Sequence, residues 1–265
     1  MVTKLHIDNW ITKAEPDYYT MFIKAWIPFN AWYFTEYGTK KDSEAISKIK
    51  GTNNKIKNRI KALLDNNGNE SKNFRLYLAQ LHLELINRNI MNYNKSVSFK
   101  HVILEDYMPT PATDTDKKGN IYKAIPDKSA GYRAIIIDKN NKTLMDRTFN
   151  PYPEDFNIFL TDNQYITLLD GEIKEKIQNC FKKIDPQKPI NLISDSNQKN
   201  GYILLDDELE IKFINDTELI AKALIQILYT LRCLLFHGEL DPTDINRGIY
   251  EHAFNLLRIL IKELK

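Results

Sequence analysis

Cysteine is scarce in this sequence, and so are the motifs that bind metals or cofactors. The two cysteines, Cys180 and Cys233, are too few for a disulfide framework or a four-cysteine zinc site. Both lie in apolar, helix-like stretches, so we predict reduced core residues. The chain also lacks a glycine-rich phosphate loop, a zinc-spaced set of Cys and His, and a serine-nucleophile elbow. We interpret the acidic run 206–208 as a polar turn, and we expect no metal and no cofactor.

Long apolar runs are also missing. No uninterrupted run approaches the roughly 20 residues that cross a bilayer, and the N-terminus lacks the basic and then apolar order of a secretory signal. We therefore expect a cytoplasmic protein with no membrane partner. A chain of 265 residues with 43% hydrophobic content can bury a sizeable core.

Net charge is low, at +2, but it is unevenly distributed. The first 95 residues hold 15 Lys and Arg against 9 Asp and Glu, and the remainder is acidic. Within the basic part, residues 48–61 are rich in lysine, and we select Lys55, Lys57 and Lys61 as candidate RNA-binding residues because cations release counterions from phosphate. The alternative is an ordinary solvated helix face.

Apolar periodicity predicts three helices in the first third of the chain. An aromatic-rich helix covers 18–37, with Pro28 expected to kink it. A basic helix follows over 43–64, interrupted or bent near Gly51. A third helix begins at Ser71 and carries an apolar stripe. We interpret the aromatic residues as core rather than as a surface that stacks bases.

The middle of the chain has extended character. Tyr132–Ile137 and Thr143–Phe149 flank a polar turn and predict a β-hairpin, whereas 106–120 is expected to be loop. A helix over 164–183 then returns to the helical pattern, and a second small hairpin is expected at 202–213. We predict a mainly α single domain over 1–265. In it, helices 18–93 and 164–264 pack together as a bundle, and 96–160 forms a β-hairpin-containing insertion.

The last 50 residues contain two amphipathic helices with an Arg and a His at their boundary. Apolar residues recur at steps of three and four over 218–237 and again over 242–264. Gly238 after His237 is typical of a helix end, and Pro242 suits the first turn of the next helix.

This arrangement carries a family resemblance. A helix that ends in Arg-x-x-x-x-His, here Arg232-Cys-Leu-Leu-Phe-His237, resembles the HEPN superfamily of helical RNA-associated domains. The aromatic helix over 18–37 is similar to the first helix of some members. The resemblance implies a helical bundle, frequent homodimerisation and often metal-independent RNA cleavage, in toxin or phage-defence systems. Cys233 departs from the family pattern, in which a polar residue often follows the arginine.

The chemistry of the pair agrees with RNA cleavage through the 2′-hydroxyl. Histidine as a residue type is suited to proton transfer near neutral pH, so His237 can act as general base or acid, and Arg232 can hold phosphate oxygens in a bidentate grip. Five residues on an ideal helix turn about 140°, so the two side chains would point in different directions. A frayed helix end or a two-fold interface between two copies would bring them together. The alternative is structural, with Arg232 paired to Glu218 or Glu239 and His237 stabilised by the helix dipole.

The sequence therefore predicts a metal-independent endoribonuclease with Arg232 and His237 as its catalytic residues. RNA, a second copy of the chain, and an antitoxin or defence-system protein are the expected partners. Two alternatives stay open. One is a catalytically inactive HEPN-like RNA-binding or scaffold protein, and the other is a plain structural interaction protein.

Overall fold

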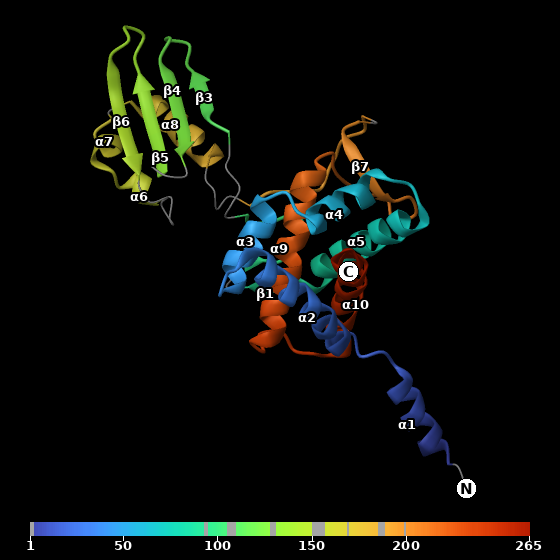
Figure 1. Cartoon of the computed structure of the whole chain (residues 1–265). Coiled ribbons are helices and arrows are strands. Elements are labelled where there is room, and N and C mark those ends of the chain that lie inside the picture. Colours follow the sequence, from blue (N-terminus) through green and yellow to red (C-terminus); the bar gives the residue numbers. More distant parts are fainter. Residues whose placement is uncertain are drawn as a thin grey trace. The chain divides into compact units, whose positions relative to one another are not determined.

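The computed structural model describes residues 3–92, 95–104, 110–127, 131–149, 157–168, 170–184, 189–198 and 200–265. The chain divides into two compact units. A helical unit combines residues 1–102 with 191–265, and a β unit comprises 103–190 (Figure 1). The mainly helical character predicted from the sequence is confirmed.

Long helices build the helical unit. Its helices are α1 (Lys4–Ala14), α2 (Tyr18–Tyr37), α3 (Asp42–Gly51), α4 (Lys55–Asp65), α5 (Asn69–Arg88), α9 (Thr217–Phe236) and α10 (Asp244–Leu260), followed by a 3-10 turn, η1 (Ile261–Leu264). Helix α10 packs against α2 and α5, and α9 packs against α3 and α4. The first and last segments of the chain thus share one bundle, as the sequence predicted for 18–37, 218–237 and 242–264.

Two details of this bundle differ from the sequence prediction. The basic helix expected over 43–64 is two helices, α3 and α4, because the chain leaves helical geometry after Gly51 and Asn54 caps the next helix with its side-chain oxygen. Helix α1 was not predicted. It is short, and Leu5, Ile7 and Ile11 on it are exposed, so it lacks the buried apolar stripe by which the other helices were recognised.

Aromatic side chains of α2 form much of the core of the helical unit. Phe22, Trp26, Phe29 and Tyr33 are buried, which confirms their assignment as core. Trp26 packs edge-to-face on Phe29 with ring centroids 5.1 Å apart. Helix α2 continues through Pro28 to Tyr37, where Gly38 ends it in the left-handed conformation.

Two short hairpins belong to the same unit. One pairs β1 (Met91–Asn92) with β2 (Lys95–Ser96), and the other pairs β7 (Tyr202–Asp206) with β8 (Ile211–Ile214). The second hairpin was predicted and packs against α5. Asp206 accepts hydrogen bonds from the backbone N–H groups of Glu208 and Leu209, which confirms the polar turn.

Among the described residues one helix, α9, is long and apolar enough to cross a membrane by length and composition alone, with a mean hydropathy of 1.7. Lys222 and Arg232 interrupt the apolar residues of α9, so the sequence contains no continuous apolar run at this place. Half of the apolar stretch of α9 is buried inside the protein. The core helix of a soluble protein can have the same length and composition as a membrane-spanning helix.

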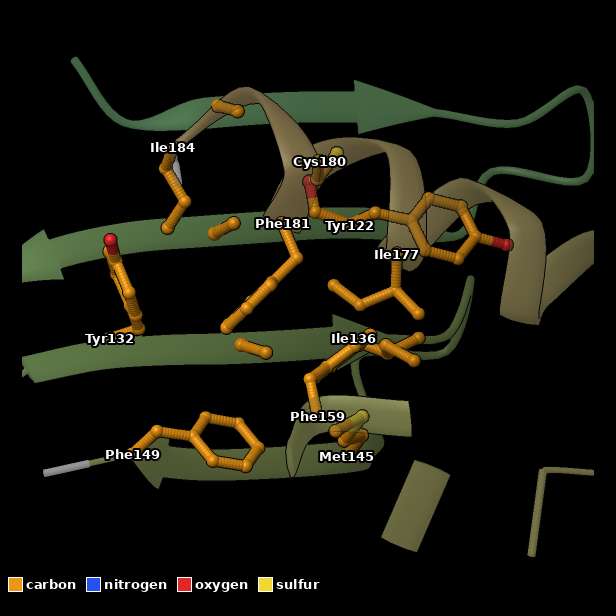
Figure 2. Close-up of a cluster of buried hydrophobic side chains, with 13 residues drawn as sticks. Tyr122, Tyr132, Ile136, Met145, Phe149, Phe159, Ile177, Cys180, Phe181 and Ile184 are labelled. Carbon is orange, nitrogen blue, oxygen red and sulfur yellow. The ribbon is translucent and has the colours of Figure 1, made fainter. Parts of the chain in front are cut away.

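The β unit is a four-stranded antiparallel sheet whose core is completed by one long helix and two short ones. Its elements are β3 (Ala112–Thr115), β4 (Ile121–Asp127), β5 (Gly131–Ile137), β6 (Thr143–Phe149), α6 (Asn157–Leu160), α7 (Asn163–Ile166) and α8 (Gly171–Lys183). The strands pair in the order β3-β4-β5-β6. Strands β5 and β6 confirm the predicted hairpin. Figure 2 shows the core between the sheet and α8, in which Phe181 stacks on Phe159 with centroids 4.3 Å apart.

The predicted single domain with helix 164–183 in the bundle was wrong. Most of that segment is α8, whose Ile177, Cys180 and Phe181 are buried against the sheet of the β unit, as is Ile184 directly after the helix. Part of the predicted loop 106–120 is strand β3. Residues 106–109 of that loop lie outside the described part of the chain. A two-stranded hairpin buries too little apolar surface to be stable alone, so two more strands and α8 complete the layer.

Candidate active site at the end of α9

Helix α9 carries the predicted site and ends in a regular way. Asp216 caps its start by accepting a hydrogen bond from the N–H of Leu219 at 2.9 Å. At its other end His237 keeps a helical backbone (φ −90°, ψ −1°), and its N–H donates to the carbonyl oxygen of Cys233 at 2.9 Å. Gly238 follows with φ +66°, the left-handed conformation that glycine adopts with least strain. The predicted helix end at Gly238 is confirmed, and the helix is not frayed there.

Arg232 is held inside the helical unit. Its Nη2 lies 3.0 Å from Oδ2 of Asp42, and about a fifth of each side chain is exposed. The guanidinium also lies over the ring of Phe236, with Cζ 4.5 Å from the centroid. Nη1 is 4.0 Å from Sγ of Cys233, and Nε is buried with no hydrogen-bond partner among the described residues.

Asp42 has two more partners, both on α2. Its Oδ1 accepts hydrogen bonds from the hydroxyl of Tyr33 at 2.6 Å and from Nδ2 of Asn30 at 3.0 Å. Burial, and then the hydrogen bond to Asp42, raise the pKa of Tyr33 above its ordinary value. Tyr33 therefore stays protonated and donates to the carboxylate.

The partners proposed for Arg232 in the structural alternative are not the ones observed. Glu218 binds Lys57 and Lys61 instead, and Glu239 is exposed. Asp42, Asn30 and Tyr33 were not selected from the sequence, because no local pattern links them to an arginine on α9. Two weak signals existed. Asn30 is polar in an otherwise apolar helix, and Asp42 opens α3, where a carboxylate is favoured.

His237 lies in a different environment from Arg232. Its side chain is exposed and makes no hydrogen bond, ion pair or ring contact among the residues that the structure describes. Because the backbone is helical at both positions, the rotation of about 140° between them is retained. One chain therefore does not bring the two side chains together: Arg232 faces α3, whereas the imidazole of His237 faces solvent.

Several apolar or sulfur-bearing side chains surround this helix end. Phe236 and Ile245 are 51% and 62% exposed, on either side of the turn that joins α9 to α10. Cys233 is half-buried beside Arg232 rather than in the core, whereas Cys180 is fully buried as predicted. Burial, and then the neighbouring Cys233, raise the pKa of Tyr229 on the same helix.

The three candidate RNA-binding lysines have different surroundings. Lys57 is 5% exposed, and its ammonium lies 2.6 Å from Glu218 while donating to the carbonyl oxygen of Lys50. Lys61 lies 3.1 Å from the other oxygen of Glu218. Only Lys55 is exposed without a partner among the described residues. The three side chains therefore do not form one open basic surface.

In the described part of the chain, no group of three or more His, Cys, Asp and Glu is placed to hold a metal ion. An open pocket of about 490 Å³ lies beside the β7–β8 hairpin and includes Asp207, Glu210 and Lys212 in its lining. Neither Arg232 nor His237 lines it, so the candidate site is an exposed helix end rather than this pocket.

Comparison of the chain with protein-family models, with curated proteins and with solved structures found no match. The resemblance to HEPN domains therefore rests on features of the sequence: the residues from Arg232 to His237, the two amphipathic helices on either side of Gly238 and the aromatic helix over 18–37.

Proposed function

We propose that the protein is a metal-independent endoribonuclease of a toxin or phage-defence type that acts in the cytoplasm and cleaves RNA through the 2′-hydroxyl. The observation that carries this proposal is that the end of α9 holds an exposed imidazole at His237 and, five residues earlier, a guanidinium at Arg232 that is fixed by Asp42. The two groups supply the proton transfer and the charge stabilisation that the reaction needs.

The reaction uses no external reagent in its first step. One imidazole takes the proton of the 2′-hydroxyl, and the resulting oxygen attacks the adjacent phosphorus. Arg232 stabilises the added negative charge on the phosphate oxygens. The bond to the 5′-oxygen of the next nucleotide then breaks, and that oxygen receives a proton from a second imidazole. The products are a cyclic 2′,3′-phosphate and a free 5′-hydroxyl.

The second imidazole and the convergence of Arg with His both point to a second copy of the chain. A two-fold axis near Gly238 would place two copies of Arg232 and of His237 around one phosphate. Phe236 and Ile245 expose apolar surface at this turn, as the core of such an interface requires. In the setting that the HEPN resemblance implies, an antitoxin or other defence-system protein would bind the same surface.

A second function is favoured by one observation. Asp42 already neutralises the charge of Arg232, which agrees with a catalytically inactive HEPN-like RNA-binding or scaffold protein in which Arg232 only joins α9 to α3. The two functions differ in whether Arg232 and His237 are needed for RNA cleavage.

The experiment compares cleavage of single-stranded RNA by the full chain and its variants, with and without excess EDTA. His237→Ala and Arg232→Gln should each abolish cleavage, and the wild type should remain active in EDTA. His237→Ala should keep its stability within about 0.5 kcal/mol because the side chain is exposed. Matched controls are His101→Ala, at an exposed histidine, and Arg258→Gln, at an exposed arginine that also lies over a phenylalanine ring; both should stay active.

Mixing an excess of His237→Ala with the wild type tests the shared site. Heterodimers of the two chains contain only one imidazole, so cleavage that needs two should fall as heterodimers replace wild-type dimers. A dimeric mixture that keeps the full activity of its wild-type chains would contradict the shared site. Cleavage that disappears in EDTA, or survives in both single variants, would refute the proposed reaction and favour the scaffold.

A further inference from the structure

We infer that Asp42 is a positioning residue that holds the guanidinium of Arg232 in the orientation needed to receive an RNA phosphate. The inference rests on the proposed ribonuclease function and deepens it. It also assigns supporting roles to Tyr33 and Asn30, which touch Asp42 and not the phosphate.

Asp42 is itself fixed from several sides. One carboxylate oxygen accepts from Tyr33 and Asn30, and the other binds Arg232. Nδ2 of Asn30 also lies 2.5 Å from the hydroxyl of Tyr33, so the two donors on α2 form one connected group. The position in the first turn of α3 adds the favourable dipole of a helix N-terminus. A carboxylate held at both oxygens is a rigid reference point for the arginine.

Arg232 keeps donors available after it binds Asp42. A guanidinium has five N–H groups, and the contact with Asp42 is made by Nη2. Among the described residues Nη1 contacts only Sγ of Cys233, at 4.0 Å, a weak acceptor at long distance. Phe236 supports the plane of the guanidinium from its face. The guanidinium is thus oriented through Nη2, whereas Nη1 has no oxygen acceptor among the described residues. A phosphate oxygen can fill that place.

The same contact could instead mask Arg232 until RNA displaces the carboxylate. The hydrogen bonds from Tyr33 and Asn30 argue against this, because displacement of Asp42 would leave both donors, which are part-buried, without their acceptor. Neighbours that orient a functional group typically change activity about 10- to 100-fold when removed, and this range sets the expected effect.

The test uses Asp42→Asn, which keeps the shape but removes the charge, and Tyr33→Phe, which removes one hydrogen bond to the carboxylate. Glu44→Gln is the matched control, since Glu44 is also acidic and in the first turn of α3 but is exposed and lies 3.8 Å from Lys41. Asp42→Asn should lower kcat for single-stranded RNA about 10- to 100-fold, Tyr33→Phe less, and Glu44→Gln not measurably.

Two further measurements separate positioning from a merely structural role. In an Arg232→Lys background, which keeps a cation but not the guanidinium, Asp42→Asn should lower the residual cleavage less than it does in the wild type, because its effect passes through the guanidinium. In the free protein, the Nε–Hε signal of Arg232 in nitrogen NMR should report an ordered guanidinium in the wild type and a mobile one in Asp42→Asn.

The NMR measurement does not depend on activity, so it distinguishes the possible failures. A wild type that orders Arg232 through Asp42 but cleaves no RNA would refute the proposed function and leave the orientation by Asp42 standing. A guanidinium that is equally ordered without the Asp42 charge would overturn the inference. Faster cleavage by Asp42→Asn would also overturn it and identify the carboxylate as a mask.

Discussion

His82 on α5 is expected to make the helical unit less stable in mild acid. Its side chain is 3% exposed and packs edge-to-face on Phe99 and Phe213, with centroid distances of 6.0 and 5.6 Å. Nδ1 is buried with no hydrogen-bond partner among the described residues. Burial, and secondly the positive charge of Lys100, lower the pKa of His82 to about 4. These surroundings make His82 a structural residue of the core.

The sign of the effect follows from the protons that each state binds. Below pH 6.5 the histidine of the unfolded chain takes up a proton, whereas the folded protein holds His82 neutral until about pH 4. The unfolded state is therefore favoured increasingly as the pH falls through this window, and the effect is constant below it. Each unit of pKa difference corresponds to about 1.4 kcal/mol. Between pH 7 and pH 5 the expected loss from His82 is about 2 kcal/mol.

The assay compares the wild type with His82→Phe, which keeps an aromatic ring against Phe99 and Phe213 but cannot titrate. Urea unfolding of both proteins is followed by far-ultraviolet circular dichroism at pH 7 and pH 5. The wild type should lose about 2 kcal/mol more than the variant over this interval, because contributions from the carboxylates are common to both. His101→Phe, at an exposed histidine, is the control and should behave like the wild type. Equal losses in the wild type and His82→Phe would refute the reasoning.

Two further predictions concern stability. Lys57→Ala should destabilise the protein by about 2 kcal/mol, because the buried carbonyl of Lys50 loses its donor while Glu218 keeps only Lys61, whereas Lys55→Ala should change the free energy of unfolding by less than about 0.5 kcal/mol; equal values in thermal or urea unfolding would contradict the burial of Lys57. Gly238→Ala should cost about 1 kcal/mol, because alanine is strained at φ +66° although space for its Cβ is open; an unchanged melting temperature would contradict this.

Local sequence patterns predicted the helices and strands that form from interactions between residues close together in the sequence. Helices α2, α9 and α10 have apolar residues at helical spacing, and the β5–β6 hairpin has two extended runs around a polar turn. The helix end at Gly238 was predicted because its signal is a single residue with unusual backbone freedom. These features depend on short-range geometry, which can be predicted from the order of neighbouring residues.

The candidate site was predictable only in part. Arg232 and His237 are neighbours on one helix, so a spacing motif was sufficient to select them. Nothing local indicated that Asp42, Tyr33 and Asn30 would surround the guanidinium, because these residues meet only when α2, α3 and α9 pack together. The lysines of α4 illustrate the same limit. Their positive charge is visible in the sequence, but the burial of Lys57 against Glu218 of α9 depends on contact between distant helices.

The sequence by itself determined that this is a mainly helical protein with a β segment, and it selected one Arg and one His at a helix end. Only the tertiary structure decided that α8 covers a four-stranded sheet rather than joining the bundle, and that Arg232 faces a fixed carboxylate while His237 faces solvent. The physical reason is the same in both cases. A helix forms from interactions within a few residues, but the direction of its apolar face and the partner of a buried charge are chosen by whichever distant surface packs against it.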